Sequence, residues 1–235
     1  MRKKFSIIIP VLNEGNTIQH VVNHLMSIID SEKDEIIVVD GDPKGSTVNY
    51  LPHLPVLTCI TTEKGRGHQM NAGAGNSGGD VLIFLHADTL LPEDGLECID
   101  LALEDGQAVG GAFDLGFDDP HWWFAIVAAS GSLRSRLTRI PFGDQGHFFR
   151  RDYFFSTGGY PEIPLMEDVE IMRSVKRRGD LIRILDSRVR TSARMWYKNG
   201  FIMNTLKNYA IQLMYLAGMP VEDLARLYYR EKGKS

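Results

Sequence analysis

The stretch Val81-Leu82-Ile83-Phe84-Leu85-His86-Ala87-Asp88-Thr89 joins five apolar residues to a histidine, a small residue and an aspartate. A continuous apolar run of this length predicts a buried strand. Ligands of open α/β sheets bind just beyond the carboxyl ends of the strands, where His86 and Asp88 are expected. Because residues two apart on an extended chain point to one side, this pair can hold a divalent metal and, through it, a phosphate. The alternative is that Asp88 only caps a helix starting near Pro92, and this stretch alone does not decide between the two.

Strands and helices alternate over the first half of the chain. Asn16 is expected to cap the first helix, and Pro92 is expected to be the first residue of the third. The strands are apolar throughout rather than alternating, which favours a parallel sheet with helices on both faces. The predicted strands are 5–12, 35–39, 56–61 and 81–85, and the predicted helices follow residue 16, lie within the glycine-rich tract 65–79, and span 92–104.

The second half has a different order of elements. Gly179 is expected to end one helix, and Gly218 with Pro220 to separate the last two. The predicted strands are 109–117, 146–150 and 181–185, and the predicted helices are 122–137, 167–178, 201–217 and 221–229.

Composition limits the classes of function. A length of 235 residues suits one large domain, and a net charge of −4 gives no global case for nucleic acid binding. Two cysteines suggest neither a disulfide framework nor a zinc site, so a reducing, cytoplasmic setting is expected. No run approaches the ~20 apolar residues of a membrane span, so the protein is expected to be soluble or to lie on a membrane face.

Acidic side chains follow several predicted strands. Glu14, Asp40 and Asp88, with His86, are expected to face one crevice at the carboxyl edge of the sheet. Such carboxylates can accept hydrogen bonds from a base or ribose, or bind a metal. For Asp40, which precedes a glycine, an Asx turn is the alternative.

The tract Lys64-Gly65-Arg66-Gly67-His68-Gln69-Met70-Asn71-Ala72-Gly73 combines glycines with basic side chains. Glycines let the backbone approach a ligand closely, and the charges of Lys64 and Arg66 suit a diphosphate. The tract is neither a Walker loop nor the dinucleotide fingerprint. A flexible surface turn is the structural alternative.

Two adjacent carboxylates, Glu167 and Asp168, open the predicted helix 167–178. Helix N-termini stabilise negative charge, so acids in a first turn are common for structural reasons alone. The functional alternative is a general base that takes a proton from an acceptor hydroxyl as the oxygen attacks an electrophilic carbon.

Four motifs, taken in order, resemble those of the family 2 glycosyltransferases. They are SIIIPVLNE at 6–14, IIVVDG at 36–41, HAD at 86–88 and ED at 167–168. The resemblance covers about residues 4–190. A narrower resemblance, to the small bacterial radical-SAM/selenodomain-associated transferase 2 group, rests on tracts 65–73, 163–170 and 191–194.

The resemblance implies an α/β GT-A nucleotide-diphospho-sugar transferase fold, with a mainly parallel central sheet flanked by helices. It implies one domain, 1–235, with a nucleotide-sugar half at about 4–105, an acceptor and catalytic half at about 106–190, and C-terminal helices at about 195–235. The implied reaction is metal-dependent and inverting. The basic motif of processive members is absent, which favours single transfer.

The resemblance also assigns roles to residues. Asp168 matches the catalytic base, and Asp88 matches the last Asp of the family's Asp-x-Asp motif, which binds Mn²⁺ or Mg²⁺ on the diphosphate. His86 replaces the first Asp of that motif, and imidazole suits Mn²⁺ better than Mg²⁺. Pro10, Leu12 and Glu14 would line the nucleoside pocket, Asp40 would contact the base, and Arg66 would lie near the ribose or phosphates.

The expected partners are a UDP- or GDP-linked sugar and a lipid or small-molecule acceptor. The acceptor side is expected within 110–165, where residues 121–124, Arg134, Arg136 and Arg139 are candidates for acceptor or membrane-surface contact and 143–146 can line the pocket. An ordinary helix with a buried aromatic face is the favoured interpretation of 122–137. The apolar face of helix 201–217 is expected to be a packing or homodimer face; its residues are Ile202, Leu206, Tyr209, Leu213 and Leu216.

Two other functions compete with sugar transfer. A nucleotidyltransferase would share the α/β architecture and metal use, but it usually carries a basic glycine-rich loop after the first strand, and 13–16 do not supply one. A non-catalytic nucleotide-sugar-binding protein is favoured only by His86. The pair at 167–168 argues against it.

Overall fold

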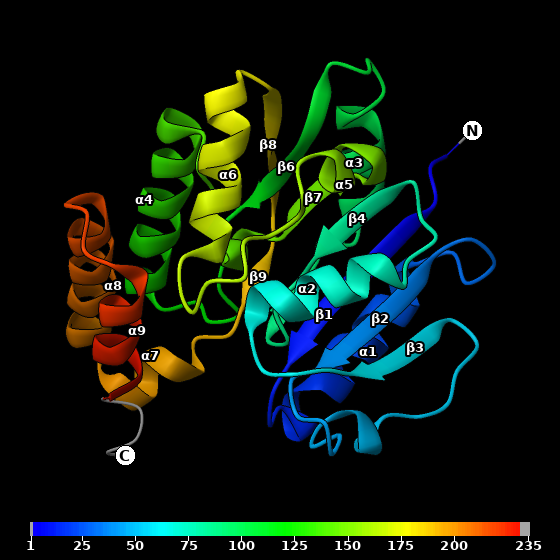
Figure 1. The fold of residues 1–235 in the computed structure, drawn as a ribbon, viewed down its shortest axis with the longest axis horizontal. Coiled ribbons are helices and arrows are strands. Elements are labelled where there is room, and N and C mark those ends of the chain that lie inside the picture. Colours follow the sequence, from blue (N-terminus) through cyan, green and yellow to red (C-terminus); the bar gives the residue numbers. More distant parts are fainter. Residues whose placement is uncertain (1, 231–235) are drawn as a thin grey trace.

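The computed structural model describes residues 2–230, and within them one mixed sheet forms the centre of the molecule (Figure 1). The strand order is β3-β2-β1-β4-β7-β6-β8. The first four are parallel, as predicted, whereas β7 runs antiparallel to both β4 and β6, and β6 and β8 are parallel. The bounds are β1 Phe5–Val11, β2 Glu35–Asp40, β3 Leu57–Thr61, β4 Val81–Phe84, β6 Ala108–Asp114, β7 His147–Arg150 and β8 Leu181–Arg188.

Helices cover both faces of the sheet. On one face, Ile7 and Ile9 of β1 pack with α1 (Gly15–Ile28) and α3 (Gly95–Ala102). On the other, Ile8 packs with the helices α2 Arg66–Gly75, α5 Arg151–Ser156 and α6 Glu167–Arg178. Alternate residues of one strand thus belong to two separate cores, which explains why the strands are apolar throughout.

Three local predictions are wrong. Helix α1 begins after Glu14, so Asn16 is not its N-cap. Helix α3 begins at Gly95 rather than Pro92. A short strand β5 (Thr89–Leu90) intervenes and pairs with β9 (Arg190–Thr191). Asp88 therefore precedes a strand, and the interpretation of Asp88 as a helix cap is excluded.

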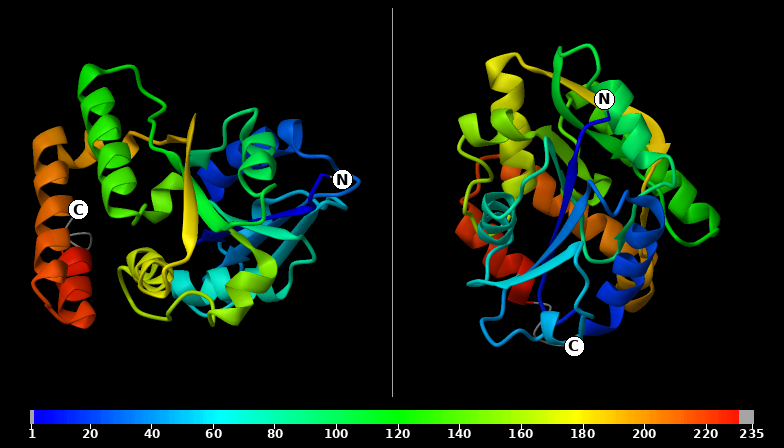
Figure 2. Two further views of the ribbon diagram at one scale, coloured as in Figure 1. Left: turned by 90° about the horizontal axis from the view of Figure 1, so that it is seen from above. Right: turned by 90° about the vertical axis from the view of Figure 1, so that its right-hand side faces the viewer.

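The remaining helices gather beyond the β8 edge of the sheet (Figures 1 and 2). They are α4 Trp122–Thr138, α7 Arg194–Asn199, α8 Phe201–Leu216 and α9 Val221–Arg230. Helix α4 has the predicted buried ring at Phe124, but Trp122 is exposed. Helices α4 and α8 lie side by side, with Ser130 Oγ and the Tyr209 hydroxyl 3.4 Å apart. Among the described residues, no helix combines the length and apolarity needed to cross a membrane.

The expected packing face of α8 is largely exposed in the described part of the chain, although Tyr209 also lines a cavity and contacts α4. The apolar side chains at positions 202, 206, 209, 213 and 216 are 44–70% exposed. The polar residues of the helix, including Asn208 and Gln212, face a cavity inside the protein instead. Helix α8 is thus amphipathic with its apolar side turned outward.

Helix α2 approaches the sheet closely at a glycine. A β-carbon on Gly73 would lie 2.4 Å from Ile8 Cγ2, so the glycine permits this contact. We predict that Gly73→Ala lowers the free energy of unfolding by about 2 kcal/mol through overpacking. Gly75→Ala in the same helix, where a β-carbon meets nothing within 4 Å, should be neutral or stabilising by up to about 1 kcal/mol. Urea denaturation measures both; equal effects would contradict the packing argument.

Candidate functional site

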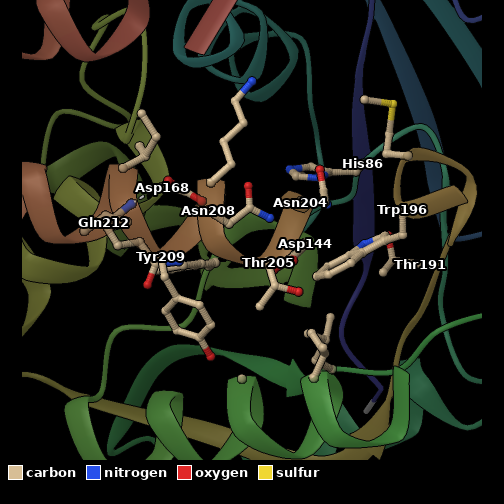
Figure 3. A pocket seen from close by; sticks show the side chains of 18 of the residues that line it. His86, Asp144, Asp168, Thr191, Trp196, Asn204, Thr205, Asn208, Tyr209 and Gln212 are labelled. Carbon is tan, nitrogen blue, oxygen red and sulfur yellow. Dashed lines mark hydrogen bonds between the residues drawn. The ribbon is translucent and has the colours of Figure 1, made fainter. Parts of the chain in front are cut away.

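A cavity of about 330 Å³ lies between the carboxyl end of β4 and helices α4, α6 and α8 (Figure 3). It brings together four of the predicted site residues: Arg66, His86, Asp88 and Asp168. They come from α2, from the turn after β4 and from the first turn of α6, which are far apart in sequence. The sheet therefore assembles the acids and bases of both halves of the chain around one space.

Asp168 is held by two backbone groups. Its Oδ2 accepts a hydrogen bond from the Gly143 N–H at 2.7 Å, and its Oδ1 accepts one from the Val169 N–H at 2.8 Å. The chain enters α6 through Met166, whose φ of 68° is left-handed and uncommon for a side chain of this kind. These contacts fix the carboxylate at the cavity wall before any ligand binds.

Gly143 fits closely between two site residues. A β-carbon at this position would lie 2.9 Å from His86 Nε2 and 3.2 Å from Asp168 Oδ2. The 3₁₀ turn η2 (Gly143–Gln145) can therefore present its N–H to Asp168 only because residue 143 has no side chain.

The neighbouring acid, Glu167, has a different role. It is 2% exposed, and its Oε1 lies 3.2 Å from Arg66 Nη1. Burial raises the pKa of Glu167, and Arg66 opposes that rise. Burial lowers the pKa of Arg66, but Glu167 and Asp168 outweigh it, so the net shift is upward. Glu167 thus fixes a permanent positive charge beside the cavity.

Asp88 and His86 both line the cavity, although not for the reason predicted. Residues 86–89 form a turn in which the Thr89 N–H donates to the His86 carbonyl oxygen, so strand alternation does not apply. Burial and the nearby Glu14 raise the pKa of Asp88, whose carboxylate has no hydrogen bond to another described residue. Burial and Arg66 lower the pKa of His86 to about 3, so its imidazole is neutral at pH 7.

The donor atoms available to a metal are therefore few. Among residues 2–230, no group of three histidine, cysteine, aspartate or glutamate side chains is arranged to hold a metal ion. Asp88 supplies an unpaired carboxylate and His86 a neutral imidazole, which fit a metal that takes its other ligands from a bound diphosphate and water.

Asp144 is a site residue that the predicted set of site residues did not include. It lines the cavity from η2, within the 143–146 segment that was expected to line the acceptor pocket. Burial and the charge of Asp168 raise the pKa of Asp144 to about 6, against the opposing charge of Arg134. The cavity thus contains a second acid whose ionisation is unfavourable in the folded protein.

Asp144→Asn is predicted to stabilise the metal-free and nucleotide-free protein above pH 6. Because its folded pKa, about 6, exceeds the unfolded value of 3.8, ionisation of Asp144 costs stability as the pH rises through this window. The variant should gain about 1–2 kcal/mol at pH 7.5, after allowance for solvent screening, and nothing near pH 4. Melting temperatures across pH 4–8 test this, with exposed Asp152→Asn as control. A gain that does not depend on pH would contradict the assignment.

Asp40 does not reach the cavity. Its side chain is 0% exposed, and its oxygens accept hydrogen bonds from the N–H groups of Asp42 (3.0 Å), Thr47 and Val48 (3.2 Å). This is the Asx-turn alternative. In this structure Asp40 holds the loop 41–47, and the expected contact with a nucleobase stays a prediction.

The other predicted nucleoside residues lie outside the cavity wall. Pro10 and Leu12 are half-buried near the end of β1. Glu14 Oε2 lies 3.3 Å from Arg194 Nη2, which brings tract 191–194 to the nucleoside side. Lys64 is exposed, with its Nζ 5.9 Å above the Tyr229 ring. The sequence did not single out Gln69, whose Nε2 donates at 2.8 Å to the carbonyl oxygens that end β1 and β2.

Of the three arginines predicted on the acceptor side, only Arg134 lines the cavity. Arg136 is paired with Asp114 and Asp186, at 3.0 and 2.7 Å. Arg139 is the exposed C-cap of α4. The separation follows from helical geometry, because positions 134 and 136, two residues apart, project from different sides of α4, and Arg139 lies beyond the end of the helix.

Known proteins match parts of this chain in sequence. The family model described as Glycosyl transferase family 2 matches residues 6–159. A glucosyl-3-phosphoglycerate synthase of Mycobacterium tuberculosis is 25% identical over 98 residues, which are 38% of this chain and 30% of that protein. A dolichol-phosphate mannosyltransferase of Pyrococcus furiosus is 27% identical over 146 residues, 59% of this chain and 42% of that protein. The chain thus spans less than half the length of these curated relatives.

Solved structures match in fold. The mannosyltransferase PcManGT from Pyrobaculum calidifontis, in complex with GDP-Man and Mn²⁺, superposes with a TM-score of 0.57 at 20% identity, covering 80% of this chain and 55% of that one. Staphylococcus aureus TarS 1–349 in complex with UDP-GlcNAc gives a TM-score of 0.60 at 17% identity, covering 80% and 58%. These likenesses confirm the expected α/β GT-A fold.

Proposed function

This chain belongs to glycosyl transferase family 2 and is a member of the glycosyltransferases, and we propose that it moves one sugar from a nucleotide-diphosphate donor to an acceptor hydroxyl, with inversion. The observation that carries the proposal is one cavity in which the Asp168 carboxylate, fixed by two N–H groups, faces the same space as the unpaired carboxylate of Asp88. Family membership removes the nucleotidyltransferase alternative.

The proposed reaction is a single displacement at the anomeric carbon. Asp168 takes the proton of the acceptor hydroxyl, whose oxygen forms a bond to that carbon. The bond from the carbon to the diphosphate breaks, and its electron pair leaves with the phosphate oxygen. Such a displacement needs one base and no protein nucleophile. In this cavity Gly143 and Val169 orient the base, and Arg66, fixed by Glu167, supplies positive charge towards the departing diphosphate.

Asp88, with His86 beside it, would hold a divalent metal in this proposal. The PcManGT complex contains Mn²⁺ with GDP-Man, which supports a metal of this kind. When bound, the metal neutralises charge on the leaving diphosphate. Glu14 and Arg194 would border the nucleoside, together with Pro10 and Leu12.

We also propose a narrower group within the family and a cellular compartment. The radical-SAM/selenodomain-associated transferase 2 group is supported by its three tracts, since Arg66, Asp168 and Thr191, one from each, all line the cavity. Cys59 and Cys98 are both free thiols, which supports a reducing, cytoplasmic setting.

A thermal-shift screen tests the proposed function. The full chain is heated with UDP- and GDP-linked sugars, each in Mn²⁺ and in EDTA. At 100 times its dissociation constant a donor should add about 2.7 kcal/mol of stability, and one nucleotide class should do so only with Mn²⁺. No gain with any donor would contradict nucleotide-sugar binding, and equal gains in EDTA would contradict the metal. Adenine nucleotides serve as the control.

A further inference from the structure

A second cavity, of about 530 Å³, adjoins the first between α4, α6 and α8. We call it the side groove. It shares Arg134, Phe142, Met166, Val169 and Gln212 with the catalytic cavity, so the two spaces lie on either side of the same residues. Its wall is largely apolar, formed by Ile140, Phe142, Met166, Val169, Tyr215 and Leu216. This apolar space, whose wall includes Met166 and Val169 on either side of Asp168 in the sequence, is poorly matched to a polar nucleotide sugar.

Arg134 stands at the junction of the two spaces. Its Nη1 donates to the Ile140 carbonyl oxygen at 3.0 Å, and its guanidinium carbon lies 3.4 Å from the centre of the Phe142 ring. No carboxylate of the described chain lies within ion-pair distance of it. A planar cation fixed in this way is prepared to bind a carboxylate or phosphate through its remaining N–H groups.

The rim of the side groove carries excess positive charge. Arg173 and Arg177 share a single carboxylate, Glu170, at 3.1 and 3.5 Å. Lys176 donates from its Nζ to the Thr138 carbonyl oxygen at 2.9 Å rather than to an acid. In a chain of net charge −4, an apolar groove with such a rim is complementary to an apolar molecule with an anionic group.

The side groove continues onto the outside of the protein. Leu216 lines it and is also 70% exposed, and it ends the outward apolar side of α8. A chain longer than the groove could therefore extend over Leu216 towards Leu213, both of which are exposed.

We propose, resting on the proposed function, that the acceptor is a single-chain anionic amphiphile. Its apolar chain lies in the side groove, its phosphate or carboxylate binds Arg134, and its hydroxyl reaches Asp168. This assigns a substrate class to the acceptor half of the site.

Calorimetry on the full chain tests the proposal with four probes: dodecyl phosphate and dodecanoate below their micelle concentrations, dodecanol, and inorganic phosphate. The dodecyl anions should bind at least about tenfold more tightly than dodecanol or inorganic phosphate. The tighter of the two anions identifies the acidic group. Arg134→Gln should weaken the dodecyl anions about tenfold. Arg139→Asn removes one charge from the exposed end of the same helix and should leave binding unchanged.

Leu216→Ser supplies a second test, because this exposed side chain is not needed for folding. It should weaken dodecyl phosphate several-fold and leave butyl phosphate unaffected. Equal binding of inorganic and dodecyl phosphate, or equal loss in the Arg134 and Arg139 variants, would overturn the proposal. So would amphiphile binding that makes the protein dimerise. If Mn²⁺-dependent nucleotide binding persists while no amphiphile binds, this inference fails and the proposed function stands.

Discussion

Asp168→Asn is expected to abolish sugar transfer while leaving metal-dependent donor binding intact. The amide oxygen can still accept the hydrogen bond from Gly143, whereas the amide nitrogen cannot accept the one from the adjacent Val169, so one of the two contacts that hold this side chain is kept. An amide cannot take the proton of the acceptor hydroxyl, so turnover should fall by about 10³-fold. Release of nucleoside diphosphate from the donor measures turnover, and thermal shift with donor and Mn²⁺ measures binding.

Asp152→Asn is the matched control for this variant. It makes the same chemical change in the first turn of a helix, α5, away from the cavity. It should retain both turnover and binding. Turnover of Asp168→Asn within tenfold of the parent would remove Asp168 as the base, and Asp144 would then be the next carboxylate to test. Loss of binding together with turnover would instead assign Asp168 to the donor. Full loss of turnover with binding retained also argues against a non-catalytic binding protein.

Asp88→Asn is the second substitution for which we expect a large effect on binding and turnover. The Asp88 carboxylate has no hydrogen bond or ion pair with another residue that the structure describes, so its removal should act mainly on ligands. The Mn²⁺-dependent part of the thermal shift should disappear, and turnover should fall by at least about 10²-fold, since metal stabilisation of the leaving charge is worth several kcal/mol.

The metal-free protein supplies an internal control for Asp88→Asn. Burial and Glu14 raise the pKa of Asp88, so its ionised form is unfavourable in the folded state and costs stability above that pKa. The variant should therefore melt at the same temperature as the parent or higher at pH 7.5 in EDTA. A lower melting temperature would mean that the loss of activity reflects damage to the fold.

Local patterns predicted the elements whose cause is local. Helix α6 begins at Glu167 and ends before Gly179, as expected, because the acidic first turn and the left-handed glycine are both signals in the sequence. The predicted bounds of strands β1 and β4 were also close to the observed bounds, because buried parallel strands are continuous apolar runs. The pairing of β5 with β9 joins residues about a hundred positions apart, and no local sequence pattern predicts it.

The site divides in the same way. Asp88, His86, Arg66 and Asp168 could be gathered from strand ends and motifs, because the carboxyl edge of a parallel sheet brings such positions together. The contacts of Asp40 could not be predicted in this way, because they depend on the conformation of the loop that follows it. Amphipathicity identified α8 as a helix but did not show which side of it faces the protein interior. The polar side faces a polar cavity here, which reverses the usual rule that the apolar side faces inward.

Crystals grown with Mn²⁺ and the nucleoside diphosphate chosen by the screen test the central claim most directly. Anomalous scattering locates the manganese without reference to any assumed chemistry. We predict one peak beside the Asp88 carboxylate, in contact with the diphosphate, with Asp168 free on the opposite wall of the same cavity. A peak elsewhere, or a diphosphate bound without metal and away from Asp88, would contradict the account.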